Sequence, residues 1–285
     1  MANSPPVPAK ASRESIKEVT TEIIRKHDLR SPCEACRNFS RCSIVGSAAF
    51  TLMGPHCTRN CKFCVIKHNK KPGRLENEEP ERLAATIRAL GLRHVILTSV
   101  SRDDLDDMGA EHFARCIRAI KRWNPHTAVE VSIPDFSGKK ELIKKVVDAG
   151  PDIIGHSIET VRRLQPVVRD GMHGYGQSLR TIRAIRELSR DMIIKSSLML
   201  GFREQRFEVL AALRHLRKAG TDIVTIGQYL RPTKNHLQVL EYVPKDAFEF
   251  YEREAYQLGY KHVIAKSSAT HSYPSREMLA LMHGL

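Results

Sequence analysis

The stretch CTRNCKFC at residues 57–64 decides how the rest of this sequence is interpreted. Its three cysteines have the spacing C-x3-C-x2-C, which places three thiolates on one tight loop. A zinc site generally has four ligands, often as two CxxC or CxxH pairs, and this loop supplies only three. Three thiolates suit a [4Fe–4S] cube that keeps one iron open for a small ligand. We therefore predict that Cys57, Cys61 and Cys64 bind an iron–sulfur cluster.

Four further cysteines complete a set of seven. Cys33, Cys36 and Cys42 form a second triad, C-x2-C-x5-C. Cys116 stands alone in a helical pattern, where a buried core residue is expected. Disulfide frameworks are typical of small secreted chains, and this chain of 285 residues does not match that class. Clustered thiolates in other proteins favour a soft metal or an iron–sulfur cluster.

Composition and charge narrow the classes of partner. Hydrophobic residues make up 41% of the chain, yet no run approaches the roughly 18 apolar residues that span a bilayer, so we expect no membrane partner. The net charge of +14 attracts anions, but one Trp and 6% aromatics offer few platforms for stacking bases. We expect an acidic protein partner rather than a nucleic acid. The expected compartment is reducing: the cytoplasm, or the mitochondrion in a eukaryote.

Apolar runs alternate with helical patterns through most of the chain. The runs recur at roughly 30–45 residues, the rhythm of βα units in a parallel barrel or doubly wound sheet. Six strands are predicted, at residues 48–54, 94–100, 128–133, 152–154, 192–200 and 222–226. Helices are predicted at residues 80–90, 110–123, 139–149, 178–189, 204–218 and 245–258. We expect an α/β fold, a partial (β/α)6 barrel of the TIM type.

Several strand ends carry polar residues, and this is the barrel end where active sites form. They are Thr98-Ser99, Pro134-Asp135, His156-Ser157, Lys195-Ser196 and Gly227-Gln228. Each pair alone is an ordinary loop start, but five at the same end of successive units indicate a site.

Long segments between Cys33 and Tyr273 resemble the lipoyl synthase family of the radical S-adenosylmethionine (SAM) superfamily. The matching stretches are CTRNCKFC, TSVSRDDLDDMGAEHF (98–113), IPDF (133–136), HSIETV (156–161), KSSLMLG (195–201) and TIGQYLRPTKNH (225–236). The cysteine loop, with Phe63 before its last cysteine, is general to the superfamily, whereas TIGQYL is distinctive of lipoyl synthases.

The resemblance implies a radical SAM sulfurtransferase. Its substrate is an octanoyl chain in amide linkage to a lysine of a carrier protein. A deoxyadenosyl radical, made when one electron from the cluster cleaves SAM, abstracts hydrogen so that sulfur enters at C6 and C8. The sulfur comes from a sacrificial auxiliary [4Fe–4S] cluster, so SAM and two clusters are the implied cofactors. Because cofactors carry this chemistry, no side chain is expected as a nucleophile or general base.

The family also implies ligands and partners. The expected contacts with SAM are Phe63, Thr98, Ser99, Ser196 and Glu204. The expected auxiliary ligands are Cys33, Cys36 and Cys42, with either Ser272 or His271. The expected partners are an acidic octanoylated carrier, an electron donor such as ferredoxin or flavodoxin, and an iron–sulfur carrier that rebuilds the spent cluster.

Three motifs depart from the family pattern. The family's first motif is C-x4-C-x5-C, and the shorter gap here displaces only Cys33. Its C-terminal Arg-Ser-Ser-Tyr motif falls on residues 270–273, where His271 replaces one serine. Arg203 replaces a glycine in the turn before Glu204, and it is strained if that position needs a positive φ.

The expected organisation has four parts. Residues 1–12 form a flexible tail, 13–47 an extension with the first cysteine triad, 48–258 the barrel, and 259–285 an extension that closes the auxiliary cluster. Other functions stay open, namely a divergent or split-system sulfur-inserting radical SAM enzyme and a tRNA methylthiotransferase-like enzyme. The latter generally carries an added RNA-binding domain, for which no residues remain. A metal-stapled nucleic-acid-binding module conflicts with the βα units.

Overall fold

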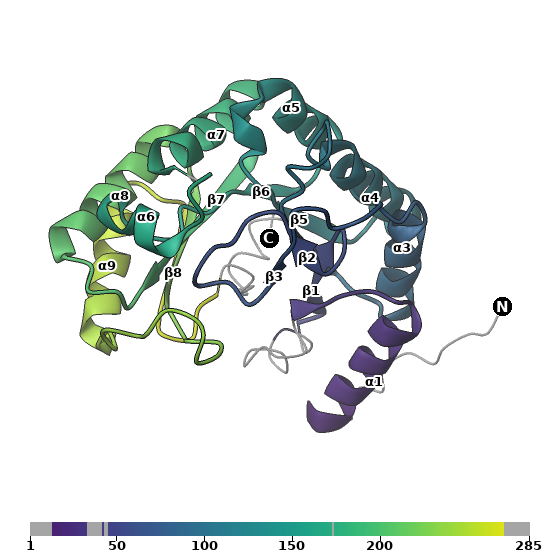
Figure 1. Cartoon of the computed structure of the whole chain (residues 1–285), viewed down its shortest axis with the longest axis horizontal. Coiled ribbons are helices and arrows are strands. Elements are labelled where there is room, and N and C mark those ends of the chain that lie inside the picture. Colours follow the sequence, from purple (N-terminus) through teal and green to yellow (C-terminus); the bar gives the residue numbers. More distant parts are fainter. Residues whose placement is uncertain (1–12, 33–41, 43–44, 173, 271–285) are drawn as a thin grey trace.

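The computed structural model describes residues 13–32, 42, 45–172 and 174–270. Seven parallel strands form one curved sheet in the order β1-β4-β5-β6-β7-β8-β9. They are β1 (Ser47–Leu52), β4 (His94–Ser99), β5 (Ala128–Ser132), β6 (Ile153–Gly155), β7 (Ile193–Leu200), β8 (Ile223–Gln228) and β9 (His262–Ala265). Helices cover the outer face of the sheet in an arc (Figure 1). The predicted α/β partial barrel is confirmed.

The helices pack an apolar stripe against the sheet and turn charged residues outward. In α4, Phe113, Ile117 and Ile120 are fully buried, while Arg118 and Arg122 are exposed. The larger helices are α1 (Arg13–Lys26), α3 (Glu79–Ala89), α4 (Ala110–Trp123), α5 (Lys140–Asp148), α7 (Tyr175–Leu188), α8 (Arg206–Ala219) and α9 (Lys245–Gln257). Three short helices are η2 (Phe136–Gly138), η3 (Arg162–Leu164) and α6 (Gln165–Val168). Across the described ranges, no helix has the length and apolarity needed to cross a membrane.

The sheet has a seventh strand beyond the six that the sequence pattern indicates. Strand β9 pairs with β8 in parallel, with His262 opposite Ile223. It lies past residue 258, where the predicted barrel ends, so the sheet continues into the range assigned to the C-terminal extension. Its four residues, HVIA, are too few to stand out. In the described residues no helix follows β9, so the alternation of strand and helix that identifies the other strands is missing here.

Lys195 lies near the start of β7 rather than at its end, because the strand continues to Leu200. Its Nζ atom is 2.8 Å from Glu130 Oε1 on β5, and both side chains are 3% exposed. His94 Nε2 on β4 lies 3.5 Å from Glu130 Oε2, and Ser47 Oγ on β1 lies 2.8 Å from His94 Nδ1. Four strands thus contribute to one buried polar network, which lies toward the amino ends of the strands.

This network makes stability depend on pH. Burial acts to raise the pKa of Glu130, but the Lys195 ammonium and His94 outweigh it and lower the pKa to about 2. An unfolded glutamate has a pKa of about 4.3. The stabilisation is therefore complete above about pH 4.3 and is lost as the pH falls toward 2.

We expect Lys195→Met to destabilise the fold by about 3–5 kcal/mol, because it leaves the Glu130 carboxylate buried without a cation. The double variant Lys195→Met/Glu130→Gln should recover most of this loss. Urea unfolding at pH 7 measures both variants, and equal instability of the single and double variants would contradict the explanation. Between about pH 2 and 4, the double variant should also show a shallower pH dependence than the wild type.

Candidate functional site

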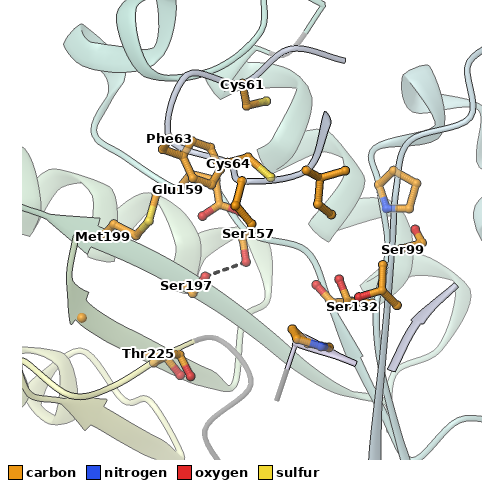
Figure 2. A pocket seen from close by; sticks show the side chains of 18 of the residues that line it. Cys61, Phe63, Cys64, Ser99, Ser132, Ser157, Glu159, Ser197, Met199 and Thr225 are labelled. Atoms are coloured by element: carbon orange, nitrogen blue, oxygen red, sulfur yellow. Dashed lines mark hydrogen bonds between the residues drawn. The ribbon is translucent and has the colours of Figure 1, made fainter. Parts of the chain in front are cut away.

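A cavity of about 630 Å³ opens at the carboxyl ends of the strands. Cys61, Phe63 and Cys64 of the cysteine loop form one wall, and Ser157 and Ser197 face them across the space (Figure 2). These two serine hydroxyls are hydrogen-bonded at 2.6 Å. The cavity therefore occupies the end of the barrel at which parallel barrels build their sites.

The cysteine loop starts from a small parallel pairing of β2 (His56–Cys57) with β3 (Lys67–His68). Backbone N–H groups are directed at two of its sulfurs. Cys57 Sγ accepts from the N–H of Ser101 at 3.2 Å and of Arg59 at 3.4 Å. Cys61 Sγ accepts from the N–H of Asp170 at 3.4 Å. Such donors favour a charged sulfur over a neutral thiol and tune the reduction potential of a bound cluster.

The three thiols form a donor set that fits a cluster. Burial raises the pKa of Cys61 to about 12 and that of Cys64 to about 11, so without a metal both sulfurs keep their protons. Bound iron takes the place of these protons. Within the described residues, no three His, Cys, Asp or Glu side chains converge as ligands of a single ion. A [4Fe–4S] cube binds each thiolate through a different iron, so its ligands need no common centre.

The loop is held to the barrel by a buried guanidinium. Arg59 donates from Nε and Nη2 to the two carboxylate oxygens of Asp103, at 2.8 and 2.7 Å, and from Nη2 to Asp135 Oδ1 at 2.8 Å. Thr58 Oγ1 lies 2.6 Å from Asp103 Oδ2. Burial acts to raise the pKa of Asp103, but the hydrogen bonds from Arg59 and Thr58 lower it. We call Arg59, Asp103 and Asp135 the arginine hub; it joins CTRNCKFC, TSVSRDDLDDMG and IPDF at one point.

The predicted SAM contacts divide into two groups. Phe63, Thr98 and Ser99 line the cavity. Ser196 and Glu204 are not among its lining residues. On β7 it is the neighbouring Ser197 that reaches the cavity, and Glu204 Oε2 accepts from the N–H groups of the preceding turn.

Comparisons with known proteins agree with this geometry. A model of the radical SAM superfamily matches residues 51–216. The lipoyl synthase of Halorhodospira halophila is 45% identical over 259 residues, covering 90% of this chain and 78% of that protein. The lipoyl synthase of Caldicellulosiruptor bescii is 46% identical over 254 residues, covering 88% and 87%. The chain belongs to the lipoyl synthase family.

Solved structures extend the likeness to the fold. Methylornithine synthase (PylB) has a TM-score of 0.58 at 15% identity, covering 88% of this chain and 77% of that one. The hydrogenase maturase HydG has a TM-score of 0.59 at 15% identity, covering 90% and 69%. At this identity the two structures show the fold alone. The lipoyl synthase relatives and the superfamily match confirm the predicted enzyme class and its cofactors, SAM and [4Fe–4S] clusters including an auxiliary one.

The turn after β7 departs from the lipoyl synthase pattern in sequence and is strained in structure. Arg203, which replaces the family's glycine, has a φ of 61°. The left-handed conformation costs a non-glycine residue roughly 1–2 kcal/mol. The turn is held by Glu204 Oε2, which accepts from Gly201 N at 2.9 Å and Phe202 N at 3.0 Å. Arg163 Nη2 also donates to the Arg203 carbonyl at 3.0 Å.

We expect Arg203→Gly to stabilise the fold by about 1 kcal/mol, because glycine adopts a positive φ without a clash. For a domain of this size that corresponds to an increase in Tm of about 2–4 °C, measurable by calorimetry. Arg203→Ala removes the same exposed side chain but keeps a Cβ at positive φ, so it is the matched control. If alanine stabilised as much as glycine, the cause would lie in the side chain rather than in the backbone.

Glu159 is among the cavity residues of this lipoyl synthase family member that were not predicted. Glu159 lines the cavity from the segment after β6 and has a φ of 63°. Burial raises its pKa, with Arg169 acting in the opposite direction. Its backbone continues the pairing with β7, since Met199 N donates to Glu159 O at 2.8 Å. Only its position in the HSIETV stretch distinguishes it in the sequence, because a strained backbone conformation leaves no mark in the pattern.

The predicted auxiliary ligands are only partly described. Cys33, Cys36, His271 and Ser272 lie outside the described residues, whereas Cys42 is described and buried. Pro32 and Thr270, the residues immediately before Cys33 and His271, both line the cavity. The lone Cys116 is fully buried in α4, as its helical pattern predicts.

The approach of the C-terminal segment to the cavity depends on a glycine of the TIGQYL stretch. A Cβ on Gly227 would lie 2.1 Å from the carbonyl oxygen of Ala269, so only glycine lets residue 269 pack this closely on β8. Ala269 is 4% exposed and precedes Thr270 on the cavity wall.

Proposed function

We propose that this chain makes a lipoyl group by inserting sulfur at C6 and C8 of an octanoyl chain amide-linked to a lysine of a carrier protein. The observation that carries the proposal is a single cavity lined by the cysteine loop, by Pro32 and by Thr270. Its walls are partly apolar, as a saturated acyl chain requires. The apolar lining residues include Ile66, Ile133, Leu198, Met199 and Leu230.

Cys57, Cys61 and Cys64 would hold the SAM-binding cluster. When bound, the reduced cluster and SAM supply the radical that removes hydrogen from an unactivated carbon. The protein's part is to position the reactants and to exclude water. Phe63, Thr98, Ser99 and Glu159 lie on the cavity wall, where they can contact SAM. Small displacements here cost large factors in rate, because the carbon must lie within reach of both the radical and the sulfur.

Cys33, Cys36 and Cys42, together with Ser272 or His271, would hold the auxiliary cluster as the sulfur source. Two observations support this placement. Pro32, which directly precedes Cys33, lines the cavity. Thr270, which directly precedes His271, lines it as well. The two sequence motifs, more than two hundred residues apart, therefore start from the same cavity.

The chemistry requires further partners. Reduction of the SAM cluster needs a one-electron donor, which we propose is a ferredoxin or flavodoxin. An auxiliary cluster that is consumed must be rebuilt, so an iron–sulfur carrier is also proposed. A reducing compartment suits both, either the cytoplasm or the mitochondrion of a eukaryote.

An anaerobic turnover experiment tests the proposal. The reconstituted protein should contain about eight irons, as two four-iron cubes require. With SAM, a reductant and an octanoyl-lysyl carrier, mass spectrometry should show two sulfurs gained per octanoyl chain. Cys61→Ser should stop deoxyadenosine formation altogether, whereas Cys36→Ala should stop only the sulfur transfer. Deoxyadenosine without sulfur transfer by the wild-type protein would overturn the proposal.

A further inference from the structure

Positive charge gathers on two short segments near the cavity. Residues 62–75 and 230–240 contain seven Lys and Arg and no Asp or Glu, so they carry half of the net charge of +14. All seven side chains are exposed: Lys62, Lys67, Lys70, Lys71, Arg74, Arg231 and Lys234. We call them the mouth cations.

The two segments meet at the opening of the cavity. Leu237 N donates to the carbonyl of Lys62 at 3.3 Å, which ties one segment to the other. Val65 and Leu230 both line the cavity, yet they are 65% and 39% exposed. An apolar lip of two side chains therefore lies between the cavity and the mouth cations.

The mouth cations have no acidic partner among the described residues. None of them forms an ion pair with a carboxylate in the part of the chain that the structure describes. On the outer helices some exposed cations are paired and others, such as Lys145 and Lys218, are not; the pairs are Arg118 with Glu111, Lys140 with Glu187, Lys144 with Asp148, and Lys245 with Glu249. What distinguishes the mouth cations is that seven of them lie in two adjoining segments that contain no Asp or Glu. Like charges held together without counter-charges repel one another, so an anionic partner that covers them is favoured.

We propose that the mouth cations, with the lip of Val65 and Leu230, form the docking surface for a carrier domain that is acidic around its acylated lysine. The inference rests on the proposed function, in which the octanoyl-lysine enters the cavity through this mouth. A nucleic acid is the other polyanion to consider, but neither segment presents an exposed Phe, Tyr or Trp for stacking bases. A protein domain with acidic residues around an apolar acylated lysine matches both the charge and the lip.

Two triple variants with the same change in net charge test the docking surface. The first, Lys70→Glu/Lys71→Glu/Lys234→Glu, reverses three mouth cations away from the cysteines. The second, Lys139→Glu/Lys145→Glu/Lys218→Glu, reverses three exposed lysines, one just before α5, one on α5 and one on α8, which serve as the control. For each holoenzyme we would measure the Kd and KM of an acidic octanoylated carrier domain and the turnover of a short uncharged octanoyl-lysine peptide.

The first variant should raise the Kd and KM for the carrier roughly tenfold or more at low ionic strength, with a smaller effect at high salt. Peptide turnover should stay within about twofold of wild type, and the control should bind the carrier like wild type. Equal losses in both variants would mean that only net charge matters, and the proposal would be wrong. It would also be wrong if wild type bound tRNA more tightly than the carrier and only the first variant lost that binding. If wild type transferred no sulfur to the octanoylated carrier itself, the proposed function would fail.

Discussion

Arg59→Met is expected to lower SAM cleavage by at least about 100-fold and to destabilise the fold by about 3–5 kcal/mol. Methionine keeps the length of the side chain but leaves the carboxylates of Asp103 and Asp135 buried without the cation that both contact. The cysteine loop also loses the guanidinium that links it to the segments after β4 and β5. Because Arg59 lies two residues after Cys57 and two before Cys61, the spacing of the sulfurs changes when it is released.

Three measurements separate the parts of this effect. They are iron content after reconstitution, the rate of deoxyadenosine formation and urea unfolding of the protein without clusters. Arg59→Lys should recover part of the stability, since it keeps a charge but loses the three-bond fork. Arg74→Met is the matched control, because Arg74 is an exposed arginine in the segment after β3 with no ion pair to a described residue. Wild-type iron content and rate in Arg59→Met would show that the arginine hub does not position the loop.

Gly227→Ala is expected to abolish sulfur transfer while leaving deoxyadenosine formation within a few-fold of wild type. A methyl group at this position would lie 2.1 Å from Ala269 O, so residues 266–270 must move off β8. That movement takes Thr270, the residue that leads into 271–273, away from the cavity. With the auxiliary cluster disrupted, iron content should fall from about eight to about four per chain.

Gly176→Ala is the control for this variant. Gly176 lies in α7, and the nearest atom to its added Cβ is the terminal Nη1 of Arg180, at 3.5 Å. The control should keep all of its iron and transfer sulfur at the wild-type rate. If Gly227→Ala retained about eight irons, the close packing on β8 would have no part in placing the auxiliary ligands.

The sequence predicts the features that local patterns encode. Cysteine spacing identifies the loop, and the alternation of apolar runs with helical patterns predicts six of the seven strands. It does not specify which of two adjacent residues on a strand faces the cavity. Ser197 rather than Ser196 reaches the cavity, because adjacent side chains on a strand point to opposite faces. Glu204 has a separate cause, since its carboxylate accepts hydrogen bonds from two N–H groups of its own turn.

Contacts between distant residues were the other feature missing from the sequence interpretation. Arg59 and Asp135 are 76 residues apart. Asp135 is indicated only by its place at a strand end, and no pattern singles out Arg59 between the cysteines. Nothing in a single sequence pairs them. The sequence also gives no sign of the positive φ of Glu159, because three-dimensional packing imposes it.

The buried pair of Lys195 and Glu130 has a consequence for how related sequences change over time. The two residues are 65 positions apart, and loss of either one alone leaves a charge stranded in the interior. A lineage that replaces one therefore passes through a destabilised intermediate unless the other changes as well. In a deep alignment of homologues, columns 130 and 195 should accordingly vary together, as a pair of apolar residues or as a pair of opposite charges.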